Sequence, residues 1–114
     1  MPSLQRPLAL SCFVVLLGAC ASNPGEDACE AFVDAYTTRA SDECALGTRE
    51  EIRAAIFLGF STLGVDECSD FTKVRDEDSF YAECIPAIQV LECSAFSSSS
   101  SLPTSCSTQL QVVR

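Results

Sequence analysis

The sequence predicts an all-α fold, a small three-helix bundle that is stapled by disulfides and has an irregular serine-rich C-terminal loop. Three stretches of the chain place apolar side chains at the spacing of one helical face. Six cysteines in a domain of this size are typical of a disulfide framework. A run of serines from Ser97 to Ser101 has nothing to bury and predicts a flexible loop. At 114 residues the chain has room for one domain.

Residues 1–19 have the pattern of a secretory signal peptide. Arg6 supplies a positive start, an apolar run extends from Leu8 to Leu17, and Gly18-Ala19 supplies small residues before a cut. The run is far shorter than the roughly 20 residues that a membrane-spanning helix needs. The alternative, an unusually apolar N-terminal helix of the fold itself, stays open.

Cys20 follows this run, and two cleavage chemistries are open there. The stretch Leu17-Gly18-Ala19-Cys20 resembles a bacterial lipobox, in which the cysteine is acylated and becomes the first residue. Ala19-Cys20-Ala21 is also an A-x-A site, and cleavage there would release an unanchored chain that begins at Ser22. We expect lipidation of Cys20. Residues 20–25 are then an acylated cysteine with a flexible tether, and residues 26–114 form the six-cysteine helical domain.

Local signals place the three helices. The first helix is expected from Glu26 to Ala40. The second helix is expected to begin at a capping box formed by Thr48 and Glu51. Gly64 ends the second helix, and the third begins near Asp76-Glu77-Asp78. The side chains expected to face inward are Cys29, Phe32, Val33, Tyr36 and Ala40 in the first helix, Ile52, Ile56, Phe60 and Leu63 in the second, and Tyr81, Cys84, Ile85, Ile88 and Leu91 in the third.

Three features qualify this bundle. Pro86 removes a backbone donor and is expected to kink the third helix or to move its start to about Ile85. Phe57 and Leu58 make the second helix apolar nearly all round, so this helix either is central to the bundle or exposes a patch for a partner. Beyond the serine run, Val112-Val113 could add a short strand or simply fray.

The domain cysteines are expected to close three disulfides, which excludes free thiols. In an up-down-up bundle the first and third helices run parallel, which favours Cys29–Cys84 and Cys44–Cys93 and leaves Cys68–Cys106; other pairings stay open. No two of these six cysteines are closer than nine positions and the chain has no histidine, so no metal site is expected.

The charge and the missing histidine exclude several function classes. The net charge of −9 disfavours nucleic acid and electrostatic docking on an anionic membrane. Without histidine there is no Ser-His-Asp or Cys-His arrangement, and no C-x-x-C motif is present. We therefore expect neither an enzyme nor a cofactor, and a carboxylate-dependent enzyme is the alternative that stays open. The acidic groups Asp66-Glu67-Asp70 and Asp76-Glu77-Asp78 lack the glycine of an EF-hand and are expected to be a solvated surface, with weak calcium binding as the alternative.

The cysteines have a characteristic spacing: Cys84-x8-Cys93, Leu102-Pro103-x-x-Cys106, and Cys29 and Cys44 beside a helix. With the lipobox-like stretch before Cys20, this spacing resembles that of small cysteine-rich lipoproteins of predatory and soil deltaproteobacteria. This resemblance implies export, an acylated cysteine and disulfide-stapled helices, and it implies no reaction. Ala21 after Cys20 fits sorting to the outer membrane.

The expected function is a lipid-anchored module of the bacterial outer membrane with a structural or protein-interaction role. Its expected partners are the membrane, through acyl chains on Cys20, and an unidentified protein; the domain itself is expected to be a monomer. The alternative is an unanchored secreted protein that acts as a binding module, a small effector or an inhibitor.

Overall fold

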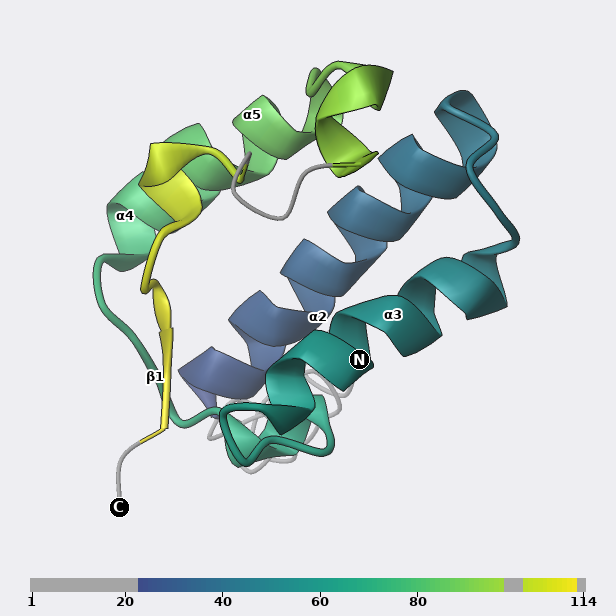
Figure 1. The fold of residues 1–114 in the computed structure, drawn as a ribbon. Helices are drawn as coiled ribbons and strands as arrows, with labels where there is room; N and C mark the ends of the chain where they lie inside the picture. Colours follow the sequence, from purple (N-terminus) through teal and green to yellow (C-terminus); the bar gives the residue numbers. More distant parts are fainter. Residues whose placement is uncertain (1–22, 98–101, 113–114) are drawn as a thin grey trace, which may run out of the picture.

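The computed structural model describes residues 23–97 and 102–112 (Figure 1). The predicted signal peptide, Cys20 and Ser98 to Ser101 of the serine run lie outside the described residues. The described chain is mostly helical, with three helices, a two-stranded sheet and three disulfides, as the all-α prediction requires. None of its helices is both long and apolar enough to cross a membrane.

The central element is the first helix, α2 (Pro24–Thr37), against which the second and third helical segments and the sheet pack (Figure 1). It begins at Asn23, whose side chain accepts a hydrogen bond of 2.9 Å from the Gly25 N–H. Pro24 follows at the first helical position, where its missing donor costs nothing. Residues 23–25 therefore belong to the folded domain, and the predicted tether to residue 25 extends too far. The core residues that α2 supplies are Ala28, Cys29, Phe32, Val33 and Ala35.

Beyond α2 the helix continues as a π-helical segment, η1 (Thr38–Glu43). The predicted inward residue Ala40 lies in this segment and is 1% exposed. A π-helix is wider than an α-helix and is frequent at functional sites. The chain then passes Cys44 and reaches the second helix.

The second helix, α3 (Arg49–Ser61), has the predicted capping box. The Glu51 N–H donates to Thr48 Oγ1 (3.1 Å) and the Thr48 N–H donates to Glu51 Oε1 (2.9 Å). The helix lies beside α2 and has no fully buried residue, so the interpretation of this helix as central is wrong. Leu58 is 73% exposed, and Leu63, predicted to face inward, is 57% exposed because it lies in the turn after the helix.

The third helix begins at its predicted position and runs through Pro86 by changing pitch. Asp76 caps α4 (Glu77–Ser79), which continues through the π-helical segment η3 (Phe80–Cys84) into α5 (Ile85–Gln89). In an α-helix a proline ring clashes with the carbonyl group of the residue four positions earlier. In this chain the turn before Pro86 is the wider π-helical segment η3 instead of an α-helical turn. The prediction that Tyr81 faces inward is wrong, because its side chain is 43% exposed and its neighbour Phe80 is buried instead.

A small antiparallel sheet, which the sequence did not predict as a pair, ties the C-terminal segment to the fold. Strand β1 (Lys73–Val74) pairs with β2 (Leu110–Gln111), and the register sets Val74 opposite Leu110. Val112, where the sequence left a strand open, follows the end of β2, and Val113 lies outside the described residues. Beside it, the buried Gln109 side chain accepts from the Asp76 N–H (2.9 Å) and donates to the Ser105 carbonyl (3.1 Å).

The disulfides among the described residues are Cys29–Cys68, Cys44–Cys93 and Cys84–Cys106. The predicted pair Cys44–Cys93 is present, whereas the predicted pairs Cys29–Cys84 and Cys68–Cys106 are wrong. In an up-down-up arrangement the end of the second helix returns beside the start of the first, which brings Cys68 to Cys29. Cys84 instead faces the short 3-10 helix η5 (Thr104–Cys106). The predicted pairs were wrong because the parallel direction of the first and third helices does not determine toward which element each cysteine side chain points.

Candidate functional site: an apolar cleft beside the first helix

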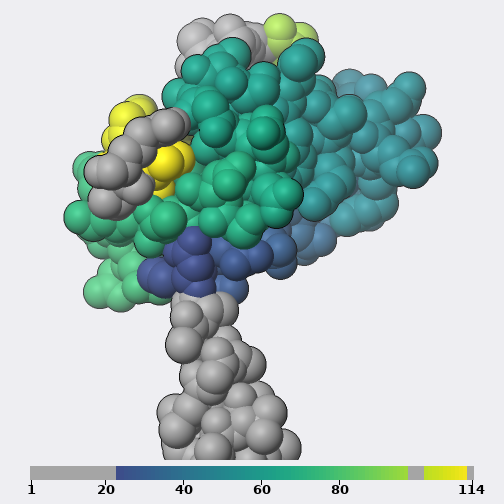
Figure 2. Space-filling model, turned by 90° about the horizontal axis from the view of Figure 1, so that it is seen from below, coloured from purple at the N-terminus to yellow at the C-terminus, as the bar shows by residue number. Residues whose placement is uncertain are grey.

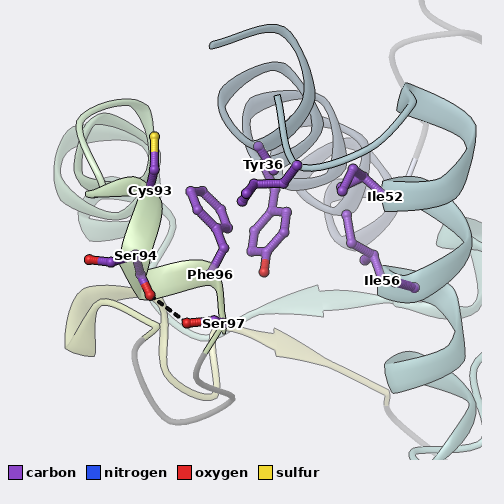
Figure 3. Close-up of a pocket in the computed structure, with 10 residues that line it drawn as sticks. Tyr36, Ile52, Ile56, Cys93, Ser94, Phe96 and Ser97 are labelled. Atoms are coloured by element: carbon purple, nitrogen blue, oxygen red, sulfur yellow. Dashed lines mark hydrogen bonds between the residues drawn. The ribbon is translucent and has the colours of Figure 1, made fainter. Parts of the chain in front are cut away.

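A cleft of about 620 Å³ lies between the end of α2, the first half of α3 and the short 3-10 helix η4 (Cys93–Ser97) (Figure 3). Its floor is formed by Tyr36 of α2 and Ala40 of η1. Ile52 and Ile56 point into it from successive turns of α3. The full lining consists of Tyr36, Ala40, Leu46, Ile52, Ala55, Ile56, Cys93, Ser94, Phe96 and Ser97.

Aromatic packing and a disulfide hold the wall that η4 contributes. The ring of Phe96 meets that of Tyr36 edge to face, with the centroids 4.9 Å apart (Figure 3). The Cys44–Cys93 disulfide joins the start of η4 to the residue after η1. Next to it, Arg39 Nε donates to the Leu91 carbonyl at 2.9 Å. The wall is therefore covalently and non-covalently attached to the helix that forms the floor.

The chemistry of the lining suits an apolar ligand. The polar side chains in the lining are the hydroxyls of Tyr36, Ser94 and Ser97, and no acidic or basic side chain is among the lining residues. Burial raises the pKa of the Tyr36 phenol above its usual value of 10.0, so the group is protonated at neutral pH. The Ser97 hydroxyl donates to the Ser94 carbonyl at 2.8 Å. The cleft thus offers contact area and hydroxyl hydrogen bonds, and its lining holds no general base for neutral pH.

A second cavity of about 250 Å³ lies further along the same seam between α2 and α3. Phe32, one turn before Tyr36, and Phe60, one turn after Ile56, contribute to it with ring centroids 6.3 Å apart. Phe71 also lines this cavity, and its ring meets that of Phe60 edge to face with the centroids 5.0 Å apart. The other lining residues are Leu63, Phe80, Leu102, Cys106, Thr108, Gln109 and Leu110.

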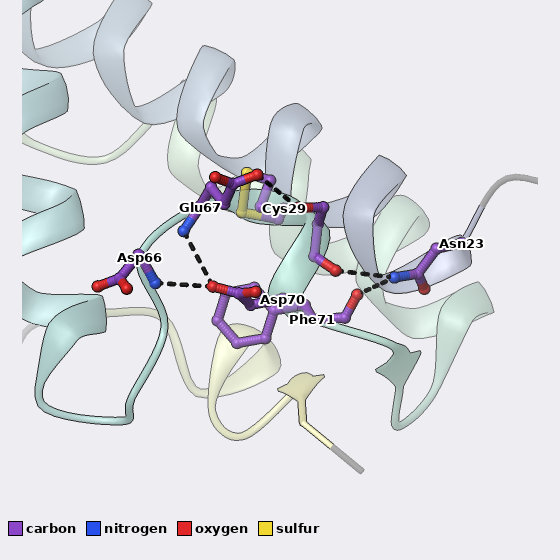
Figure 4. Close-up of a disulfide and its surroundings, with 8 residues drawn as sticks. Asn23, Cys29, Asp66, Glu67, Asp70 and Phe71 are labelled. Carbon is purple, nitrogen blue, oxygen red and sulfur yellow. Dashed lines mark hydrogen bonds between the residues drawn. A yellow bond between two sulfur atoms is a disulfide. The ribbon is translucent and has the colours of Figure 1, made fainter. Parts of the chain in front are cut away.

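The acidic groups that the sequence singled out stabilise turns (Figure 4). The Asp70 carboxylate accepts from the backbone N–H groups of Asp66 (2.9 Å) and Glu67 (3.3 Å). In the second group, the Asp76 side chain accepts from the Ser79 N–H at 3.1 Å. Within residues 23–97 and 102–112, no group of three or more acidic or cysteine side chains is arranged to hold a metal ion.

The patch suspected at Phe57 and Leu58 is not the cleft. Phe57 is half-buried under the guanidinium of Arg53, which lies 5.0 Å from the ring centroid, and Leu58 lies on the outer face of α3. Tyr36, Ile52 and Ile56 were predicted as core residues, and no motif in the sequence marked them as a site. Phe96, three residues after Cys93, was the available signal, and its ring packs against that of Tyr36.

No protein-family model matches the chain, and no curated protein or solved structure is significantly similar to it. The resemblance to small cysteine-rich lipoproteins therefore stays a prediction.

Proposed function

We propose that the protein is an exported, lipid-anchored binding module that holds an apolar part of a partner in the cleft beside α2. The observation that carries this proposal is the cleft itself, which is walled by apolar and aromatic side chains and has uncharged hydroxyls at its edge. A lining without acidic, basic or free thiol groups supports binding rather than catalysis.

Export is supported by the pairing of all six domain cysteines, because disulfides form and persist in oxidising compartments. Lipidation rests on the stretch Leu17-Gly18-Ala19-Cys20. An acylated Cys20 would lie three residues before Asn23, hence within about 10 Å of the start of α2. The cleft lies at the other end of that helix, since Tyr36 is about 18 Å further along its axis. A domain anchored in this way would hold the cleft away from the bilayer.

Intact mass spectrometry of the protein from a bacterial membrane fraction tests the anchor. We expect the mass of an acylated chain that begins at Cys20, and a Cys20→Ser variant that loses both the modification and the membrane association. An unmodified chain that begins at Ser22 would overturn the anchor and support the alternative of a secreted binding module.

A solvatochromic apolar dye tests the cleft independently of the anchor. We expect enhanced dye fluorescence with the wild-type domain and with Ala54→Trp, and loss of the enhancement with Ala55→Trp. Both alanines are exposed on α3, but Ala55 lines the cleft and Ala54 does not. Equal dye binding by the two variants would contradict a binding role for the cleft.

A further inference from the structure

The disulfide beside the cleft is open to solvent, unlike the other disulfides among the described residues. Cys93 is exposed and Cys44 is half-buried. The cysteines of the other bridges are all buried: Cys29, Cys68, Cys84 and Cys106. An attacking thiolate has to reach a sulfur atom, so exposed disulfides exchange with thiols whereas buried ones resist. The Cys44–Cys93 bridge is therefore the one placed for exchange.

Both ends of this bridge belong to segments that line the cleft. Cys93 is itself a lining residue, and it begins the wall η4. Cys44 directly follows η1 and lies two residues before Leu46, which is another lining residue. The bridge joins these segments across a sequence separation of 49 residues. A change in the bridge therefore acts on the cleft through two segments at once.

The turn after Cys44 has a conformation that its residues disfavour. Ala45 has a φ of 53°, in the left-handed region that favours glycine. The Ala45 N–H donates to the Ser41 carbonyl (3.1 Å), and the Leu46 N–H donates to the Ala40 carbonyl (2.9 Å). Opening the bridge removes a covalent constraint from this turn, so the turn is free to relax and to move Leu46.

The wall η4 has little buried surface to hold it without the bridge. None of residues 93–97 is fully buried. The hydrogen bond from the Ser97 hydroxyl to the Ser94 carbonyl lies within the wall. Phe96 contacts the floor through its ring, edge to face with Tyr36, and such a ring pair stabilises less than a long covalent loop. Segments of this kind are the first to open locally.

We propose that Cys44–Cys93 is a thiol–disulfide exchange site for a dithiol reductant, such as a protein with a C-x-x-C pair, and that its reduction releases the apolar ligand of the cleft. A thiolate of the reductant attacks Cys93 Sγ, the S–S bond breaks, and Cys44 leaves as a thiolate that takes up a proton. The second thiol of the reductant loses its proton and attacks the mixed disulfide, which frees Cys93 as a thiolate that is protonated in turn. The bridge thus gains two electrons and two protons, and the reductant becomes a disulfide. The exchange step stands by itself, whereas the release of a ligand rests on the proposed binding function.

A trapping experiment tests the exchange site. The probe is a thioredoxin in which the second active-site cysteine is replaced by serine, so that the mixed disulfide is not resolved. With the mature, oxidised protein we expect a covalent complex, and peptide mapping should place the probe on Cys93. The double variant Cys44→Ser with Cys93→Ser should give no complex. A probe attached to another cysteine, or no complex with the wild type, would overturn the exchange site.

Reversible reduction tests the link between the bridge and the cleft. Dithiothreitol is added to the wild-type protein until peptide mapping finds Cys44 and Cys93 reduced and the buried bridges intact. We expect the affinity for the apolar dye to fall roughly tenfold and to return after reoxidation. Dithiothreitol should leave the dye affinity of the double serine variant unchanged. Simultaneous loss of the buried bridges, or a dithiothreitol effect on the double variant, would overturn the proposal.

The dye separates a failure of this proposal from a failure of the binding function. If the oxidised and the reduced wild type bind the dye equally, the cleft remains a binding site and its redox control is wrong. If the oxidised protein binds no dye, the binding function is wrong and ligand release falls with it, and the trapped complex on Cys93 then decides the exchange site alone.

Discussion

Gly25, in the first turn of α2, lies directly against the backbone of Phe71. A Cβ atom at Gly25 would be 2.6 Å from the Phe71 carbonyl carbon and 2.5 Å from the Lys73 nitrogen, much closer than real Cβ contacts. The adjacent Asn23 amide donates to the carbonyls of Ser69 and Phe71 (Figure 4). The view from below shows the first turn of α2, in purple, lying against the green segment of the chain (Figure 2). The start of the first helix is therefore joined closely to the segment that follows the second.

Substitution of Gly25 by alanine should destabilise the fold by about 1–3 kcal/mol, because the new methyl group meets backbone atoms that cannot move aside. Gly59→Ala is the matched control. Gly59 lies inside α3 with nothing within 4 Å of its would-be Cβ, so alanine should stabilise the protein by about 0.5–1 kcal/mol. Urea unfolding followed by circular dichroism measures both changes, and a shift of the same sign in the two variants would contradict the close packing at Gly25.

Removal of the Thr48 hydroxyl should cost about 1 kcal/mol, because the Glu51 N–H loses its side-chain acceptor at the start of α3. Thr48→Ser keeps the hydroxyl and should retain most of the stability. Thermal unfolding of Thr48→Ala and Thr48→Ser gives the difference. If the two variants unfold together, the capping hydrogen bond does not contribute in solution.

The Cys44–Cys93 disulfide should be the first to be reduced in the native protein. Cys93 is exposed and Cys44 half-buried, whereas Cys29 and Cys84 are 0% exposed and Cys68 and Cys106 are 5% and 7% exposed. Brief treatment with a mild dithiol, alkylation of the new thiols and peptide mapping should label Cys44 and Cys93 first. Mapping of the untreated protein checks the connectivity, and a peptide joining Cys29 to Cys84 would contradict it.

Permanent removal of that bridge, by Cys44→Ser with Cys93→Ser, should lower the free energy of unfolding by about 4 kcal/mol in the chain-entropy model, given a sequence separation of 49 residues. The same model assigns about 3.4 kcal/mol to Cys84–Cys106, with its separation of 22. Because Cys93 lines the cleft, the double serine variant should also weaken dye binding. Unchanged dye binding would show that the wall holds without its covalent link.

The two tyrosines should titrate above their usual pKa of 10.0 and differ in their response to salt. Burial alone raises the pKa of Tyr36, whereas burial followed by the negative charges of Glu77 and Asp27 raises that of Tyr81. High salt screens charges, so it should lower the pKa of Tyr81 and leave that of Tyr36 in place. Phenolate absorbance of the variants Tyr36→Phe and Tyr81→Phe, recorded at low and high salt, separates the two groups.

These shifts also set the sign of a pH effect on stability. The unfolded phenol ionises before the folded one, so the contribution of Tyr36 is fully present below pH 10.0 and is lost as the pH rises through the folded pKa. Tyr36→Phe should therefore lose less stability at alkaline pH than the wild type does. A larger alkaline loss in the variant would have the wrong sign for a buried phenol.

Signals that act within a few residues predicted the local structure well. Thr48 and Asp76 were identified as helix starts because a capping side chain needs only the next turn to form its hydrogen bond. The register of the buried face of α2 was likewise readable, since Cys29, Phe32 and Val33 recur at helical spacing and are all buried. Leu63 and Tyr81 were misplaced because apolar type and spacing do not report how a helix end is oriented.

The sequence by itself determined that this is a small helical domain with paired cysteines, because helical periodicity, caps and cysteine number are properties of short segments and of composition. The tertiary structure decided which cysteines meet, how Leu110 pairs with Val74, and that Tyr36, Ile52 and Phe96 enclose one cleft. Those relationships join residues dozens of positions apart. They depend on how the helices pack around α2, which no local pattern in the chain records.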